Sequence, residues 1–150
     1  MTKIYSFSDL RFISRKTLKN WIQNGLSPSG KFLVIDVRDS DYIGGHIKNS
    51  INLPSNTFYD FLPNLYKKLY DDNIKVVVFH CMLSQSRGPS ATLKFLRGIE
   101  EINQLEIKEH ANNIDVFVLK GGFSKWQQDY GLDKSLTDNY NEEIWKFGME

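Results

Sequence analysis

Three short runs of β-branched and aromatic residues alternate along the chain with segments whose apolar residues recur at helical spacing. The runs cover 31–37, 76–80 and 115–119. Each is short, largely apolar and flanked by glycine or polar residues, which is typical of strands that are buried on both faces. A briefer fourth strand is expected at 51–53, because Pro54 ends it.

The segments between these runs predict helices. They lie at 14–25, 58–69 and 89–99, and Gly121-Gly122 is expected to form a turn into a short helix around Phe123 and Trp126. Ser14 is a capping residue for the first helix, and Gly25 provides its stop. Pro63 is expected to kink the second helix or to divide it into two. Strands that alternate with helices form mainly parallel sheets covered on both faces, so the expected fold class is α/β.

The length of the chain, 150 residues, suits a single domain over 1–150, and no repeat or flexible linker divides it. Hydrophobic residues make up 41% of the chain, which is enough to build a packed core. The segment 131–150 is less periodic. Trp145 and Phe147 within it indicate a C-terminal extension that packs back onto the domain.

The charges are nearly balanced, with 19 Lys and Arg residues, 18 Asp and Glu residues and a formal net charge of +1. A chain that binds nucleic acid usually carries a clear basic excess, so we expect no nucleic-acid partner. The start of the chain lacks the apolar stretch of a secretory signal, and the longest apolar run is far shorter than the roughly 20 residues that span a bilayer. We therefore expect no membrane association and a reducing, cytoplasmic setting, with the nucleus as a second location.

Cys81 is the only cysteine in the chain. A single cysteine excludes an intrachain disulfide, a multi-cysteine zinc site and an iron–sulfur cluster. No ligand spacing links His46, His80 and His110, so we expect no metal site. Any function of Cys81 must therefore depend on its thiol.

The residues around Cys81 predict an anion-binding loop. Cys81 follows the apolar run 76–80, and Pro89 marks a helix start shortly after it. In open α/β sheets, ligands bind at the carboxyl ends of the strands, where such a loop would lie. Loop N–H groups and the helix dipole attract an oxyanion, and Arg87 supplies a planar charged fork for two of its oxygens. The same field favours the thiolate of Cys81, so the residues predict nucleophilic attack on a phosphate-like group.

A plainer interpretation is also open at this level. A lone cysteine after an apolar strand is often an inert, buried residue. With 5 arginines in 150 residues, an arginine at the position of Arg87 occurs by chance about once in thirty cases. The strand before Cys81 and the helix start at Gly88-Pro89 favour the catalytic interpretation over coincidence.

Two further groups of motifs resemble the signatures of rhodanese-like domains. Residues 35–39, 42–47 and 50–54 are similar to the opening signature of that superfamily, and 118–126 is similar to its closing signature. Together with the cysteine loop, these matches span about 35–126 in family order. The resemblance implies a rhodanese-like α/β fold.

The number of residues between Cys81 and Arg87 indicates which branch of the superfamily the chain resembles. Five residues separate Cys81 from Arg87, which is similar to the cell-division-cycle dual-specificity phosphatases and to the small eukaryotic rhodanese-type phosphatases and arsenate reductases. This resemblance implies that Cys81 attacks phosphorus to form a cysteinyl-phosphate, which water then hydrolyses. It also implies that His80 and Gly88 support the loop. The oxyanion-binding loop it implies consists of Met82, Leu83, Ser84, Gln85, Ser86 and Arg87.

The loop departs from the cell-cycle enzymes in having no carboxylate that would protonate a leaving group. General acid catalysis contributes about 10²–10⁴-fold, so we expect aryl phosphates, phosphotyrosine-like, to be preferred over phosphoserine or phosphothreonine. Asp39 and Asp41 are candidates for a substitute acid from a neighbouring loop. Asp36 and Arg38 match signature positions and are expected to form a structural, partly buried ion pair, and His46 is expected to be structural too.

Several alternatives stay open. Arsenate reduction would suit the same loop, but it would require glutathione with glutaredoxin, because the chain has one thiol. Thiosulfate sulfurtransfer and a non-catalytic phosphate-binding module are further alternatives. A phosphatase of this kind requires no cofactor, and its partner would be a phosphorylated small molecule or a phosphoprotein.

Overall fold

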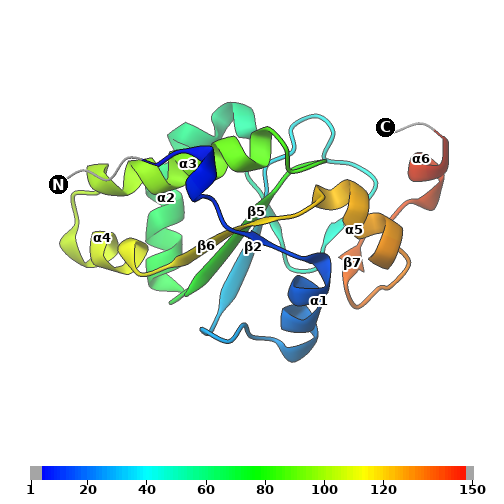
Figure 1. Cartoon of the computed structure of the whole chain (residues 1–150), viewed down its shortest axis with the longest axis horizontal. Helices are drawn as coiled ribbons and strands as arrows, with labels where there is room; N and C mark the ends of the chain where they lie inside the picture. Colours follow the sequence, from blue (N-terminus) through cyan, green and yellow to red (C-terminus); the bar gives the residue numbers. More distant parts are fainter. Residues whose placement is uncertain (1–4, 148–150) are drawn as a thin grey trace.

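A parallel β-sheet lies at the centre of the structure, a computed structural model that describes residues 5–147 (Figure 1). Its strands are Phe12–Ile13 (β1), Phe32–Asp36 (β2), Ile51–Asn52 (β4), Val76–His80 (β5) and Asp115–Leu119 (β6). Within the described residues their spatial order is β1-β6-β5-β2-β4, and each neighbouring pair is parallel. The expected α/β class with a mainly parallel sheet is confirmed.

The longer strands agree closely with the sequence prediction, whereas three strands of two residues were not predicted. These are β1 and an antiparallel pair formed by β3 (His46–Ile47) and β7 (Thr137–Asp138). Two residues cannot display the period of two that identifies a strand, and these three strands, unlike β4 before Pro54, have no proline that marks their end.

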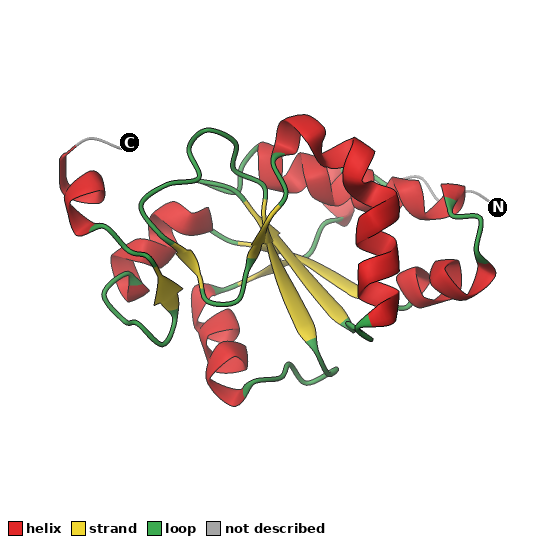
Figure 2. Cartoon of the chain, turned by 180° about the vertical axis from the view of Figure 1, so that it is seen from behind, coloured by secondary structure: helices red, strands yellow, loops and turns green. Residues whose placement is uncertain are grey.

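Helices cover both faces of the sheet (Figure 2). The helices α2 (Phe58–Asp71), α3 (Arg87–Gly98) and α4 (Leu105–Asn112) share one core with alternate residues of the central strands. The helices α1 (Arg15–Asn24) and α5 (Gly122–Tyr130) share the other core with the intervening residues. The period-two side-chain pattern of β5 therefore divides it between two hydrophobic cores.

The ends of α1 agree with their predicted caps. The Ser14 hydroxyl accepts a hydrogen bond from the Thr17 N–H at 3.1 Å, and Gly25 adopts a left-handed conformation with φ of 81°. The division of the second helix at Pro63 was wrong, because α2 is one helix that contains Pro63. Pro63 lies in its second turn and removes one backbone donor, while the apolar stripe behind it stays packed in the core.

The C-terminal segment contacts the rest of the chain through β7 and Trp145. Trp145 belongs to helix α6 (Glu142–Phe147), and its indole N–H donates to the Gly44 carbonyl at 2.8 Å. Its ring also lies 5.4 Å from that of Phe123. Phe147, which was expected to pack as well, is instead mostly exposed. Residues 148–150 lie outside the described residues.

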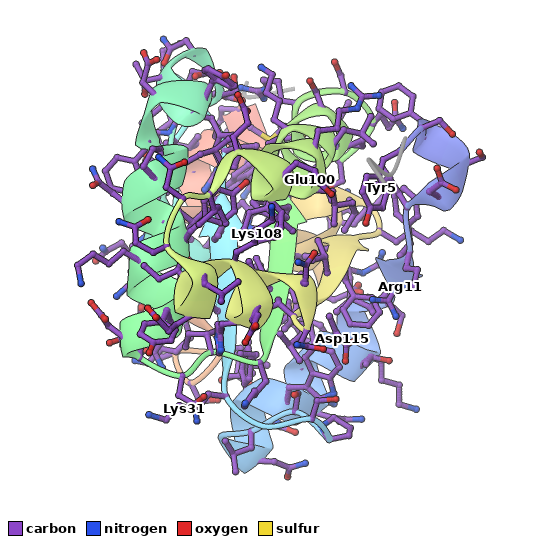
Figure 3. The ribbon with its side chains drawn as sticks, turned by 90° about the vertical axis from the view of Figure 1, so that its left-hand side faces the viewer. Tyr5, Arg11, Lys31, Glu100, Lys108 and Asp115 are labelled. Atoms are coloured by element: carbon purple, nitrogen blue, oxygen red, sulfur yellow. The ribbon has the colours of Figure 1, made fainter. Side chains whose placement is uncertain are left out.

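Surface ion pairs lie on the side of the molecule that faces the viewer in Figure 3. Arg11 lies beside Asp115, the first residue of β6, and Lys108 lies beside Glu100 (Figure 3). The charged atoms are 3.5 Å apart in the first pair and 3.8 Å apart in the second. Exposed pairs of this kind contribute little stability. Among residues 5–147, no helix has both the length and the apolar character that crossing a membrane demands.

Candidate active site

Cys81 lies at the carboxyl edge of the sheet, directly after β5. The neighbouring strands β2 and β6 end beside it, so the segments that follow them flank the loop from Cys81 to Ser86. We call this segment the cysteine loop. It leads into α3, which begins at Arg87. The carboxyl edge is where open α/β sheets bind ligands.

The sulfur of Cys81 is buried and accepts two backbone hydrogen bonds. The Ser84 N–H lies 3.2 Å from Sγ, and the Gly88 N–H, in the first turn of α3, lies 3.3 Å from it. Both donors place partial positive charge against the sulfur, and the N-terminus of α3 adds its dipole. The start of α3 and the cysteine loop thus direct two backbone donors at the sulfur.

The backbone of the cysteine loop turns its carbonyls away from the sulfur. The Cys81 carbonyl accepts from the Phe123 N–H at 3.0 Å, and the Met82 carbonyl accepts from the Ser124 N–H at 2.9 Å. Ser84 adopts φ of 57°, an uncommon left-handed conformation for a residue other than glycine. Within residues 5–147, the N–H groups of Leu83, Gln85 and Ser86 have no hydrogen-bond acceptor and are available to an anion.

Gly122 permits the close approach between the cysteine loop and α5. Its φ is 60°, and a Cβ atom at this position would lie 2.5 Å from the Met82 carbonyl oxygen. A side chain would therefore separate α5 from the loop that it holds. A turn at Gly121-Gly122 was expected from the sequence, but neither this turn nor Phe123 and Ser124 was assigned a part in the site. The two consecutive glycines were the sequence signal that could have indicated a close approach between two segments at this turn.

Arg87 is held by two carboxylates from the segment after β2. Its Nη1 and Nη2 atoms lie 2.8 Å and 2.6 Å from the two oxygens of Asp41, and Nη1 lies 3.2 Å from Asp39 Oδ2. The hydrogen bonds to Asp41 raise the pKa of Arg87 above its usual range. The structure thus brings together Cys81, Arg87, Asp39 and Asp41, all of which were predicted site residues.

The surroundings of Asp39 and Asp41 keep both carboxyl groups ionised. Burial raises the pKa of Asp39, but hydrogen bonds from Ser55, Asn56 and Arg87 outweigh it, so the pKa falls below its ordinary value. Hydrogen bonds from Arg87 are the main cause of the lowered pKa of Asp41. A general acid must hold a proton at the working pH, so this arrangement does not favour that role for either residue.

A buried ion pair fixes the segment that carries these carboxylates. Asp36 and Arg38 are fully buried, more so than expected, and their charged atoms lie 2.7 Å apart. Arg38 also donates to the Gly45 carbonyl at 2.8 Å and to the Ile43 carbonyl at 3.3 Å. Its guanidinium lies 4.4 Å from the centre of the Phe123 ring. Arg38 therefore connects the β2 end to the turn beyond Asp41.

His80 contacts the cysteine loop and the buried Asp36 carboxylate, at 3.8 Å, and His46 contacts Tyr42 and the Asp138 carboxylate, at 3.7 Å. The Nδ1 atom of His80 lies 3.1 Å from the Cys81 carbonyl oxygen, and burial lowers the pKa of His80, which favours the neutral ring. This contact agrees with a role in ordering the cysteine loop. The His46 ring stacks on Tyr42 at 5.6 Å. The third histidine, His110, lies elsewhere and contacts the Ile74 carbonyl at 2.8 Å.

Comparisons with known proteins agree with the fold. The rhodanese-like domain profile matches residues 14–129. The CDC25-like phosphatase YCH1 of Saccharomyces cerevisiae is 34% identical, over 95% of this chain and 98% of that protein. The crystal structure of S. cerevisiae Ygr203w, described as a homolog of single-domain rhodanese and the Cdc25 phosphatase catalytic domain, is 33% identical and superimposes with a TM-score of 0.83 over 100% of both chains.

A reductase shares the same architecture. The As-Sb reductase of Leishmania major superimposes with a TM-score of 0.71 at 30% identity, over 86% of this chain and 85% of that one. The profile match covers most of the chain, and the likenesses extend over nearly all of it. These findings show that the chain belongs to the rhodanese-like domain family.

Proposed function

We propose that this chain is a cysteine-dependent phosphatase that hydrolyses phosphate monoesters. The observation that carries the proposal is the pair of backbone N–H groups, from Ser84 and Gly88, that contact the Cys81 sulfur beside the available N–H groups of Leu83, Gln85 and Ser86. Such a loop binds a tetrahedral oxyanion directly above a nucleophile. The phosphatase names of the relatives support the same activity.

The reaction proceeds in two displacements. The Cys81 thiolate attacks phosphorus in line, a sulfur–phosphorus bond forms, and the ester oxygen leaves with the bonding electrons. The N–H groups of the cysteine loop and the Arg87 guanidinium bind the three equatorial oxygens. Water then attacks phosphorus, which releases inorganic phosphate and restores the thiolate.

The proposed substrates are phosphorylated small molecules or phosphoproteins with an aryl ester. The cysteine loop contains no carboxylate, and the pKa values of Asp39 and Asp41 are lowered in this arrangement. A phenolate leaves with less protonation than an alkoxide does, so phosphotyrosine should be hydrolysed faster than phosphoserine. Comparable rates on the two would contradict this preference.

The decisive experiment compares the intact chain with Cys81→Ser on p-nitrophenyl phosphate. The intact chain should release p-nitrophenol, and Cys81→Ser should release none while it still binds tungstate in calorimetry. The retained binding shows that the variant is folded. Turnover by Cys81→Ser near that of the intact chain would refute nucleophilic catalysis by Cys81.

Arsenate reduction is the second candidate, and the likeness to the Leishmania reductase favours it. Arsenate has the shape of phosphate, and its two-electron reduction to arsenite would oxidise two glutathione thiols to the disulfide, with release of water. The electrons must come from outside, because Cys81 is the only cysteine. Arsenate-dependent oxidation of glutathione, in the presence of glutaredoxin, distinguishes this activity from hydrolysis of p-nitrophenyl phosphate. Both activities need a reduced Cys81, so we also propose a reducing location, the cytoplasm with or without the nucleus.

A further inference from the structure

An open hollow of about 700 Å³ lies beside the cysteine loop. Its walls come from three parts of the chain: the segment that contains the 3₁₀ helix η1 (Phe7–Asp9) and β1, the cysteine loop with the start of α3, and the turn after β6. We call it the apolar hollow. Cavities of roughly 300–1,000 Å³ are the usual size for small-molecule sites.

Exposed apolar side chains converge on this hollow. Phe7, Phe12 and Leu83 are 60%, 49% and 49% exposed, and all three line it. A ligand that covers these side chains removes their apolar surface from water, which favours binding in proportion to the area covered. Single exposed apolar residues are common on proteins, but a cluster in one concave place indicates a binding surface.

The two sides of the cysteine loop differ in chemistry. On the β2 side, the carboxylates of Asp39 and Asp41 hold Arg87. On the β6 side lies the apolar hollow, and Leu83 belongs both to the cysteine loop and to the wall of the hollow. When the phosphate of an ester lies in the cysteine loop, the organic group bonded to it must extend out of the open side of the loop. An apolar group would displace charged contacts on the β2 side, whereas it would meet apolar walls on the β6 side.

We propose that the apolar hollow binds the apolar part of the substrate, an aromatic leaving group larger than a single phenyl ring. The placement rests on the proposed function, because the phosphate in the cysteine loop sets where the leaving group begins. The Lys120 side chain lines the same hollow and has no ion-pair partner within residues 5–147. Because Phe7, Phe12 and Leu83 make most of its wall apolar, the preferred substrate is an extended aryl phosphate rather than a small one.

The test compares the affinities of phenylphosphonate and 4-biphenylylphosphonate, which cannot be hydrolysed, by calorimetry on the intact chain. The biphenylyl compound should bind at least five-fold more tightly. Phe12→Ser should remove most of that difference while it changes the affinity for phenylphosphonate less than two-fold. The matched control is Leu132→Ser, because Leu132 is 74% exposed and does not line the hollow.

Each outcome decides one claim. Equal affinities for the two phosphonates, or no binding of either, would overturn the inference, as would an unchanged difference in both Phe12→Ser and Phe7→Ser. A change in molecular size in those variants without a change in affinity would identify a second copy of the chain as the occupant and overturn it too. Hydrolysis of phenyl phosphate is measured separately. If hydrolysis is absent and the affinity difference is present, the phosphatase proposal fails and the apolar subsite stands.

Discussion

The Arg87 guanidinium and the Asp41 carboxylate form a two-pronged ion pair, with Nη1–Oδ1 and Nη2–Oδ2 distances of 2.8 Å and 2.6 Å. The two residues are 46 positions apart in the sequence and come from the segments that follow neighbouring strands. An incoming oxyanion and Asp41 offer the same chemistry to the same fork. A bound substrate must therefore either share the Arg87 guanidinium with Asp41 or replace Asp41 as its partner.

Asp41→Asn is predicted to bind inorganic phosphate more tightly than the intact chain. The amide keeps the size of the side chain but removes a negative charge close to the bound dianion, which is worth about 1 kcal/mol at a partly exposed site. We expect a three- to ten-fold lower inhibition constant for phosphate. Asp129→Asn is the matched control, since Asp129 pairs with Arg15 at 2.7 Å away from the cysteine loop. Weaker phosphate binding by Asp41→Asn would show instead that Asp41 orients Arg87 for the anion.

The carboxylates around Arg87 should also make the stability of the fold sensitive to acid. The pKa values of Asp39 and Asp41 are lowered from their ordinary value of 3.8, so the folded state binds fewer protons than the unfolded state near that pH. Their contribution is present above about pH 4 and is lost as the pH falls through the folded-state pKa values. Urea unfolding between pH 2.5 and 6 should show a free energy of unfolding that falls toward acid. The fall should be smaller in the double variant Asp39→Asn, Asp41→Asn, and an equal fall would refute the assignment.

Local signals predicted the parts of the site that depend on one segment. The strand before Cys81, the helix after it and the spacing to Arg87 are all contained in one stretch of sequence, and the strand 76–80 agrees with β5. Burial of the Asp36–Arg38 pair was underestimated, because the sequence does not show that Phe123 and the Gly45 carbonyl surround Arg38.

The contacts between segments could not be predicted in the same way. Asp39 and Asp41 were selected as acids because of their residue type, and only the packing of β2 beside β5 shows that they reach Arg87. The hydrogen bonds from the start of α5 to the cysteine loop likewise form because β6, the strand before α5, lies beside β5. No periodicity within a segment reports the distance between two loops.

Gly122→Ala tests whether the contact between α5 and the cysteine loop is needed for activity. The new Cβ would lie 2.5 Å from the Met82 carbonyl oxygen, so the loop or the helix must move. Gly25→Ala is a matched control, since Gly25 also has a positive φ, of 81°, but has nothing within 4 Å of an added Cβ. We expect Gly25→Ala to cost about 1–2 kcal/mol of stability through backbone strain alone and to keep its activity. Gly122→Ala should cost more and should lower kcat/KM on p-nitrophenyl phosphate at least ten-fold. Equal behaviour of the two variants would show that close packing at Gly122 has no role in the site.

Arg38→Met should be among the most destabilising single changes in the chain. It leaves the fully buried Asp36 carboxylate without its partner, and it removes the donors to the Gly45 and Ile43 carbonyls. Breaking a buried ion pair by removing one partner costs about 3–5 kcal/mol. Arg15→Met provides the comparison, because the Arg15–Asp129 pair has a similar length but is partly exposed, and such pairs contribute about 0–1 kcal/mol. Urea unfolding at pH 7 measures both changes. The pair fixes the segment that positions Asp41, so a loss below about 1 kcal/mol for Arg38→Met would mean that Asp41 is held by other contacts.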